Sequence, residues 1–150
     1  MTEAAVVTVN IEATPEIVFS HLVEGDKMLR WMGVSVDLDP TPGGAFTIKM
    51  NDDITARGTY IEVVPFERVV FTWGWVGNEF VPPGSSTVAI DIAPSGEGTQ
   101  LTLTHSDLPD EDAYVQHGEG WKHFVERLVL VGAGKDPGPD AIAEAQTTSG

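Results

Sequence analysis

Apolar and polar residues alternate along most of this chain, which is the pattern of half-buried β-strands. The alternation begins at Val7, Val9 and Ile11. The Thr-Pro-Glu sequence at 14–16 then predicts the start of a short helix. A hydroxyl N-cap, a proline at the first helical position and an acid in the first turn all favour a helix N-terminus. A second short helical segment is predicted over residues 26–32.

Six more strands are predicted before the last helix. They are separated by clusters of Gly, Pro, Asn and Asp, which mark turns. On the last of them Leu101, Leu103 and His105 share one face, because successive side chains of a strand point to opposite sides. The predicted strands are 34–38, 46–50, 54–64, 69–75, 88–92 and 101–105.

A helical period replaces this alternation after the last strand. His117, Trp121, Phe124, Val125 and Leu128 recur at helical spacing and form one continuous apolar face. A sheet with one apolar face and a helix with one apolar face are expected to pack together. The sequence therefore predicts an α+β fold, in which a curved antiparallel sheet is wrapped around a long C-terminal helix, with two short helices after the first strand.

The domain organisation follows from length and composition. A chain of 150 residues fits one domain with its own core, which we place at residues 1–134. Residues 135–150 are rich in Pro, Gly and Ala and have little to bury, so they are expected to form a flexible tail.

Charge and cysteine content exclude several classes of function. The net charge is −15, and the eight Lys and Arg residues are scattered, which argues against nucleic acid and anionic membrane surfaces as partners. The absence of Cys excludes disulfides, thiolate metal ligands and Cys nucleophiles. We find no apolar segment of roughly 18 residues, as a bilayer requires, and no signal-peptide pattern at the start. A cytoplasmic protein with no membrane partner is expected.

Two histidines are candidates for chemistry. His105 is expected to point inward with Leu101 and Leu103, where it could act as an acid or base or as a structural residue that holds the strand-to-helix corner. His117 begins the inner face of the last helix, where it could bind a polar ligand group together with His105. Its alternative role is a hydrogen bond to the nearby backbone.

No metal, cofactor or complete catalytic constellation is predicted. The four His residues include no helical i, i+4 pair, and no acidic cluster accompanies them. Ser106 lies beside His105 without the Gly-x-Ser-x-Gly elbow of a serine hydrolase. Phosphate-binding and dinucleotide-binding glycine motifs are also absent from the sequence. These observations favour a protein that is not an enzyme.

The aromatic residues allow two interpretations: they fill a core, or they line a ligand cavity. On the long central strand, Tyr60 and Glu62 are expected to share one face and Ile61 and Val63 the other. Periodicity does not decide which of these faces looks inward.

Seven segments, in their order and spacing, resemble one known family. They are ATPEIVF at 13–19, LRWMG at 29–33, PGGAF at 42–46, GTY at 58–60, VVFTW at 69–73, GTQLTLTH at 98–105, and Gly120-Trp121 with Leu128. Over about residues 6–131 the chain resembles the C-terminal domain of the activator of heat-shock-protein-90 ATPase, within the SRPBCC (START-like) superfamily. The resemblance implies a helix-grip fold, often with an apolar cavity between the helix and the sheet. Members of the superfamily bind lipids, sterols or polyketides, cyclise polyketides, serve as hydrolase domains or assist a chaperone.

Our functional hypothesis is the binding of a small, mostly hydrophobic ligand between the C-terminal helix and the sheet. The aromatic residues would supply apolar contact, and the two histidines would orient a polar group of the ligand. One alternative is a co-chaperone-like module that acts on a heat-shock-protein-90-type ATPase, and another is a cyclase-like or hydrolase-like enzyme with His105 as base. The sequence leaves open whether the chain forms a homodimer. The predicted lining residues are Trp31, Phe46, Trp73, Trp75, His105, His117, Trp121 and Phe124.

Overall fold

The structure, a computed structural model, describes residues 4–138. Short helices follow the first strand, and a long helix follows the last one. The elements in chain order are β1 (Ala4–Ile11), α1 (Pro15–Val23), α2 (Gly25–Met28), β2 (Ser35–Leu38), β3 (Ala45–Lys49), β4 (Thr55–Val64), β5 (Arg68–Trp73), β6 (Ser86–Ser95), β7 (Gly98–Ser106) and α3 (Glu111–Gly132).

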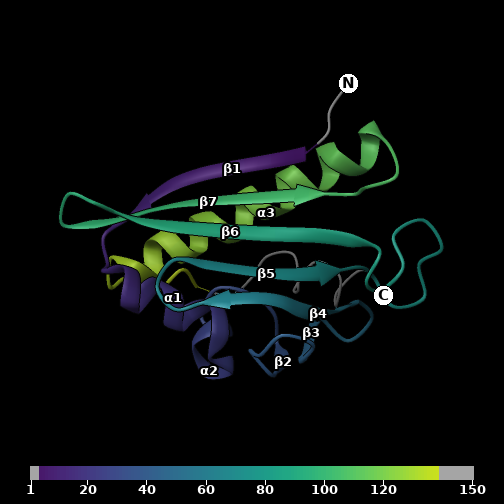
Figure 1. The fold of residues 1–150 in the computed structure, drawn as a ribbon, viewed down its shortest axis with the longest axis horizontal. Helices are drawn as coiled ribbons and strands as arrows, with labels where there is room; N and C mark the ends of the chain where they lie inside the picture. Colours follow the sequence, from purple (N-terminus) through teal and green to yellow (C-terminus); the bar gives the residue numbers. More distant parts are fainter. Residues whose placement is uncertain (1–3, 139–150) are drawn as a thin grey trace.

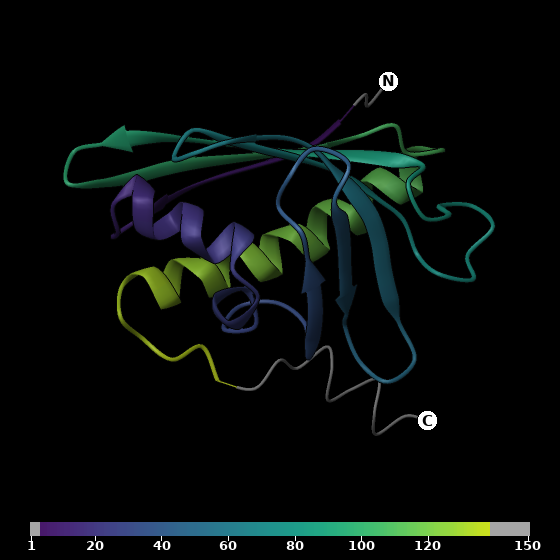
Figure 2. The ribbon, with the colours of Figure 1, turned by 60° about the horizontal axis from the view of Figure 1, so that its bottom comes forward.

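The strands form one antiparallel sheet in the order β1-β7-β6-β5-β4-β3-β2. Helix α3 runs behind this sheet in Figure 1, across the strands β1, β7 and β6. Figure 2 shows α1 and α3 on the same side of the sheet, with β2 and β3 turned toward them, so that the sheet curves around α3. The predicted α+β helix-grip fold is therefore confirmed.

A side chain caps the N-terminus of α1 and another caps that of α3. The Thr14 hydroxyl accepts a hydrogen bond from the Ile17 N–H at the start of α1, with Pro15 in the first turn. The Asp110 carboxylate accepts one from the Ala113 N–H at the start of α3. Each cap satisfies one of the backbone donors that a helix N-terminus leaves without an intrahelical partner.

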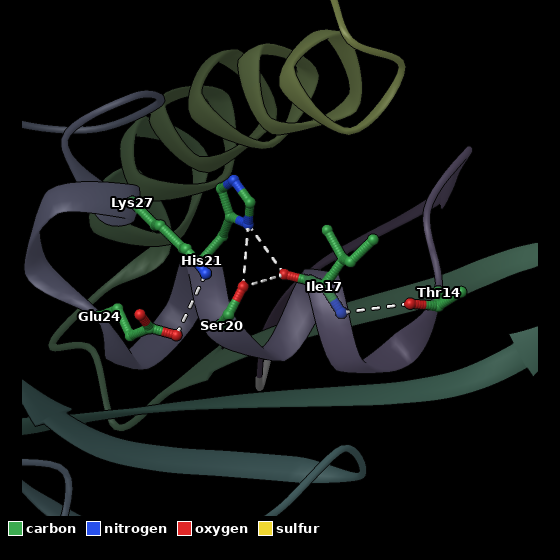
Figure 3. A network of polar contacts seen from close by, with 6 residues as sticks. All are labelled: Thr14, Ile17, Ser20, His21, Glu24 and Lys27. Carbon is green, nitrogen blue, oxygen red and sulfur yellow. Dashed lines mark hydrogen bonds and ion pairs between the residues drawn. The ribbon is translucent and has the colours of Figure 1, made fainter.

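A second set of contacts holds α1 internally. Figure 3 shows Ser20 and His21 both turned toward the carbonyl of Ile17, which Ser20 Oγ and His21 Nδ1 approach at 2.6 and 2.8 Å. An ion pair between Lys27 and Glu24 joins α2 to the end of α1. These local bonds keep α1 and α2 as one unit over the core.

The second short helix is shorter than predicted. It ends at Met28, whereas the sequence predicted helix as far as residue 32. Tertiary bonds hold the next residues in turns instead: Trp31 Nε1 donates to the His21 carbonyl at 2.9 Å, and the Trp31 carbonyl accepts from Arg127 at 3.1 Å. The side chain of Trp31 is buried, so packing sets the backbone path here.

The expectation that Tyr60 and Glu62 share a face is wrong. The pairing of β4 with β5 shifts register between these two residues, as at a β-bulge. Tyr60 is buried, whereas Ile61 and Glu62 are both exposed and Val63 packs against the core. A bulge places one extra residue in a strand, which reverses the faces beyond it.

The apolar faces of α1, α3 and the sheet meet in one main core. We call the part of this core beside α1 and α2 the closed end, defined by Trp31, Phe46, Tyr60 and Phe71. The Phe46 and Phe71 rings stack there with centroids 3.9 Å apart, and Tyr60 meets Phe46 edge-on at 5.5 Å. All four side chains are buried, so this end is filled.

The C-terminal tail is described only at its beginning. The Lys135 N–H donates to the Leu130 carbonyl at 2.8 Å, and Arg127 reaches the Pro137 carbonyl at 3.5 Å. Residues 139–150 lie outside the described residues, so the domain limit at 134 and the flexible tail stay predictions. None of the helices within residues 4–138 is long and apolar enough to cross a membrane.

Candidate functional site

A cavity of about 460 Å³ lies at the other end of the core, which we call the open end. This volume falls within the range of small-molecule sites. Three stretches form its walls: the end of β3 with the following turn, the end of β5 with the following loop, and the first half of α3. The lining residues are Met50, Asn51, Asp53, Ile54, Trp73, Trp75, Val76, Gly77, Asn78, Gln116, His117, Gly120, Trp121 and Phe124.

Five of the eight predicted lining residues border this cavity. Trp73 comes from β5 and Trp75 from the loop after it, where Trp75 forms an isolated bridge with Ala56 rather than continuing the strand as predicted. The other three are carried by α3 at the spacing that the sequence indicated. The residues brought together are Trp73, Trp75, His117, Trp121 and Phe124.

Trp31, Phe46 and His105 do not border the cavity. Trp31 and Phe46 belong to the closed end, where both are buried. His105 lies fully buried on β7, one layer behind the wall. Their inward orientation was expected, but none of the three is among the residues that line the cavity.

His105 holds one wall residue in place. Its Nδ1 accepts the indole N–H of Trp121 at 2.9 Å, and its Nε2 lies 2.8 Å from Ser86 Oγ. The Ser86 hydroxyl donates its own hydrogen to the Trp73 carbonyl at 2.7 Å, so it must accept from His105 Nε2–H. This pattern fixes a neutral imidazole and joins β5, β6, β7 and α3 in one chain of hydrogen bonds.

His117 does the same for a second tryptophan. The indole N–H of Trp75 donates to His117 Nε2 at 2.9 Å, and His117 Nδ1 donates to the Ala113 carbonyl at 2.8 Å. The helix therefore presents a neutral imidazole whose two nitrogens are both engaged. Of the two roles considered for His117, the geometry shows the hydrogen bond to the nearby backbone. His117 also accepts the bond from Trp75.

Burial lowers the pKa of both His105 and His117. The pKa of His105 is lowered to about 3, chiefly by burial and also by the nearby His117. Burial also lowers the pKa of His117, although its bond to the Ala113 carbonyl acts in the opposite direction. The two ring centroids lie 5.0 Å apart. Neutral rings are required here, because a protonated nitrogen would face the indole N–H that it now accepts.

Two asparagines hold the loops at the mouth of the cavity. Asn51 Oδ1 accepts the N–H groups of Asp53 and Ile54, at 2.8 and 2.9 Å. In the same way, Asn78 Oδ1 accepts the backbone N–H groups two and three residues further on, also at 2.8 and 2.9 Å. An Asx turn of this kind stiffens a loop without a strand or helix.

A close approach of two backbone segments also shapes the loop that carries Trp75. Gly74 lies against Pro82, and a Cβ at position 74 would overlap the Pro82 carbonyl oxygen. The Trp75 N–H then donates to the Val81 carbonyl at 2.7 Å, which closes the loop on itself. Glycine at position 74 is therefore a packing requirement of this wall.

Sequence reasoning missed Ser86 and the two asparagines. Ser86 continues the buried alternation of Val88 and Ile90 by one step, so the period-two signal extended to it. Asn51 and Asn78 each stand at the start of a turn, where Asn is favoured for its capping oxygen. Neither signal says that the turn borders a cavity, because that depends on how α3 crosses the sheet.

The wall is apolar with few charges. Among residues 4–138, Asp53 is the one charged side chain that lines the cavity, and no Lys or Arg borders it. Within residues 4–138, no group of three or more His, Cys, Asp or Glu side chains is placed to hold a metal ion. The arrangement can enclose an apolar molecule between rigid aromatic rings.

Comparisons with known proteins agree with this fold. The profile of one family, described as Activator of Hsp90 ATPase homolog 1-like protein, matches residues 12–131. No curated protein matches the sequence. An AHSA1-like protein from Rhizobium etli, solved by NMR, is 45% identical over 94% of this chain and 89% of that chain, with a TM-score of 0.72.

Two more distant structures share the fold alone. DynU16, whose crystal structure is described as that of a protein in the dynemicin biosynthetic locus, is 24% identical over 91% of this chain, with a TM-score of 0.79. The chain spans about half of DynU16, as the match covers 50% of that protein. An Hsp90 activator from Plasmodium falciparum is 19% identical over 87% of this chain and 96% of that chain, with a TM-score of 0.70.

Proposed function

The chain belongs to the family of Activator of Hsp90 ATPase homolog 1-like proteins, and we propose that it binds a small, mostly apolar ligand in the cavity at the open end. The observation that carries this proposal is the cavity of about 460 Å³ between α3 and the sheet, with Trp73, Trp75, Trp121 and Phe124 in its wall. Aromatic rings supply large apolar contact areas for a bound molecule.

Two aromatic side chains of the wall are preorganised without a ligand. Trp75 and Trp121 each have two rotatable side-chain bonds, and each ring is fixed by a hydrogen bond to a histidine. A ligand therefore loses little affinity to the ordering of these side chains. In this proposal His105 and His117 are positioning residues, and Trp31 and Phe46 support the wall from the closed end.

The histidines do not favour the enzymatic alternative. Both nitrogens of His105 are engaged within the protein, and the side chain is fully buried, so no lone pair faces the cavity. A general base needs hydrogen-bond reach to the proton that it removes. Catalysis by His105 has no geometric support in this arrangement.

The chaperone alternative rests on the family alone. The Hsp90 activator from Plasmodium falciparum shares the fold at 19% identity, a level that carries no partner over to this chain. The structure named as the Aha1 dimer from Colwellia psychrerythraea is 18% identical, so a homodimer also stays a prediction. Co-purification with an Hsp90-type ATPase would test the first, and sedimentation the second.

Gly120 offers a direct test of the ligand site. It lines the cavity, and a Cβ built on it meets nothing within 4 Å, so a larger side chain has room there. In Gly120→Leu the new side chain occupies ligand space, while leucine favours the helix by up to about 1 kcal/mol over glycine. Stability is thus expected to hold or rise while binding is lost.

Fluorescence of N-phenyl-1-naphthylamine, a neutral apolar probe, provides the measurement. We expect the purified, refolded protein to enhance this fluorescence and Gly120→Leu to weaken the affinity about tenfold or more, which corresponds to 1.4 kcal/mol. The matched control is Gly118→Ala, two residues away on the same helix and outside the cavity, which should bind as the parent does. Equal affinity of Gly120→Leu and the parent, or no binding by the parent, would contradict the proposal.

A further inference from the structure

The three tryptophans that line the cavity differ in how their indole N–H groups are paired. Those of Trp75 and Trp121 each donate to a histidine. Trp73 Nε1 is buried without a hydrogen-bond partner, in a side chain that is only 2% exposed. Its ring meets the Trp75 ring edge-on, with centroids 5.2 Å apart, and such a contact is a weak substitute for an oxygen acceptor. A buried donor without an acceptor is costly, and native structures retain few of them.

A second donor without a partner belongs to Asn51, another residue that lines the cavity. Asn51 is 3% exposed, and its Oδ1 accepts the N–H groups of Asp53 and Ile54. Because only an oxygen can accept both bonds, the orientation of the amide is fixed. Asn51 Nδ2 is therefore the atom left buried without a partner. Two neutral N–H donors from β5 and from the turn after β3 thus belong to residues of one cavity.

The remaining polar groups of the wall are unsuited to an anion. In the described part of the chain no Lys or Arg lines the cavity, and Asp53 contributes a negative charge. His117 is neutral, and both of its nitrogens are engaged. An anionic ligand would lose its hydration here without meeting a cation, which is unfavourable. A neutral oxygen atom avoids that loss and still accepts hydrogen bonds.

We infer that the cavity selects apolar molecules that carry a neutral carbonyl oxygen, which supplies the acceptor that Trp73 Nε1 and Asn51 Nδ2 lack. This inference rests on the proposed function and adds the chemical class of the ligand. A carbonyl oxygen is a neutral acceptor with two lone pairs, so it can pair with such a donor without bringing a charge into the cavity. A site that holds buried donors discriminates against a ligand without an acceptor, because the donors then stay unpaired.

Three naphthalenes of similar size test the inference. In 2-acetylnaphthalene the substituent ends in a carbonyl oxygen, in 2-isopropenylnaphthalene a methylene group replaces that oxygen, and 2-naphthoate is an anion at pH 8. Affinities are measured by displacement of N-phenyl-1-naphthylamine. We expect the ketone to bind about tenfold or more tightly than the carboxylate, for which the buried site offers no cation.

One variant removes each donor. Because the same two neutral compounds are compared in the parent and in the variant, their difference in hydration cancels from the change in the affinity ratio. Asn51→Asp keeps the oxygen that accepts the turn N–H groups and deletes the NH₂ donor. Trp73→Phe deletes the indole N–H and keeps an aromatic ring. In each variant the affinity ratio of ketone to alkene should fall about 3- to 10-fold from its value in the parent, as expected for one lost hydrogen bond.

Asn78→Asp is the matched control for Asn51→Asp. Asn78 lines the same cavity and caps its loop through the same pair of bonds, but its side chain is exposed. The same chemical change, with the same added charge, should therefore leave the ratio of ketone to alkene within about twofold of the parent. Thermal unfolding of each variant verifies that the comparison is made on folded protein.

Indole NMR signals provide a readout without mutation. The chain has four tryptophans, so four indole N–H signals are expected, assigned with Trp→Phe variants. The Trp73 signal should move downfield with the ketone and much less with the alkene. A Trp73 signal that responds equally to both compounds, together with unchanged ratios in the Asn51 and Trp73 variants, would overturn the inference.

The two proposals fail in different ways. N-phenyl-1-naphthylamine could bind, and Gly120→Leu could abolish that binding, while the affinity ratio of ketone to alkene is the same in the parent as in both donor variants. The carbonyl inference is then wrong and the ligand site stands. If the carboxylate binds more tightly than the ketone, the inference is also wrong, because the site then accepts anions. If neither the probe nor any naphthalene binds, the proposed function itself fails.

Discussion

The space between α3 and the sheet is filled at one end and hollow at the other, although aromatic side chains line both. At the closed end Phe46 stacks on Phe71 at 3.9 Å, and the backbone of α1 accepts a hydrogen bond from Trp31. At the open end Trp73 and Trp121, with ring centroids 4.9 Å apart, border a cavity of about 460 Å³. Aromatic content alone does not decide which end is filled.

The covering elements explain the difference. Figure 2 shows α1 beside the C-terminal half of α3, and Val18, Phe19 and Leu22 of α1 belong to the main core. The N-terminal half of α3 has loops beside it instead, each held by an asparagine that bonds to its own backbone. These loops border the space without filling it, because Met50 and Ile54 from one loop and Trp75 from the other stand in the cavity wall.

Truncation of one phenylalanine at each end should give the largest contrast. Phe46→Ala removes a fully buried ring, and we expect it to lower the free energy of unfolding by about 3–5 kcal/mol. Phe124→Ala removes a ring that already borders a cavity and is 7% exposed, so its cost should be about 1–2 kcal/mol smaller. Urea unfolding of ligand-free, refolded protein measures both, and equal costs would contradict a difference between the ends.

The open end should also be the more sensitive to acid. Burial lowers the pKa of His105 in the folded protein to about 3, below its ordinary value of 6.5, so the unfolded chain takes up a proton first as the pH falls. The stability that His105 contributes is therefore complete above pH 6.5 and decreases as the pH falls toward 3. Between pH 7 and pH 5 the loss from this one group should be about 2 kcal/mol.

Urea unfolding of the parent and of His105→Gln at both pH values isolates this contribution. Glutamine keeps a donor and an acceptor in the core and does not titrate. The parent should lose more stability than the variant on going from pH 7 to pH 5, since the carboxylates contribute nearly equally to both. An identical pH dependence in the two proteins would show that His105 is not held neutral by the fold.

Removal of the helix caps should have the smallest effect on stability, and the two caps should differ in their effect on ligand binding. Thr14 caps α1 at the closed end, and Asp110 caps α3 at the open end. Replacement of either by alanine should cost about 1 kcal/mol of stability. Only Asp110→Ala should also weaken binding of N-phenyl-1-naphthylamine, because the first half of α3 carries His117, Gly120 and Trp121 to the cavity. Equal effects of both changes on binding would mean that the wall does not depend on the local order of α3.

Much of the fold could be predicted because local patterns record which side of an element is buried. Leu101, Leu103 and His105 alternate in sequence and are all buried. The five-residue stripe on α3 was predicted in the same way, and four of its members are buried while His117 is partly so. The cap residue Thr14 was visible as a signal because capping acts within four residues.

Other features depended on contacts between distant segments. Helix α2 stops early because Trp31 is bonded to α1 and α3. The bulge after Tyr60 reverses the faces of β4, and strict alternation contains no signal for it. In each case a long-range bond or a change of register overrides the local preference.

The sequence by itself determined the sheet, its long helix and the inward direction of the candidate side chains that these elements carry, such as Phe46, Trp73 and Trp121. The tertiary structure decided which of them fill the core and which border a cavity. Phe46 and Trp73 both point inward and lie with ring centroids 6.0 Å apart, yet only Trp73 reaches the cavity wall. Periodicity fixes the face of a residue on its own element, whereas the position of a cavity depends on where α3 crosses the sheet and on which elements cover the remaining space.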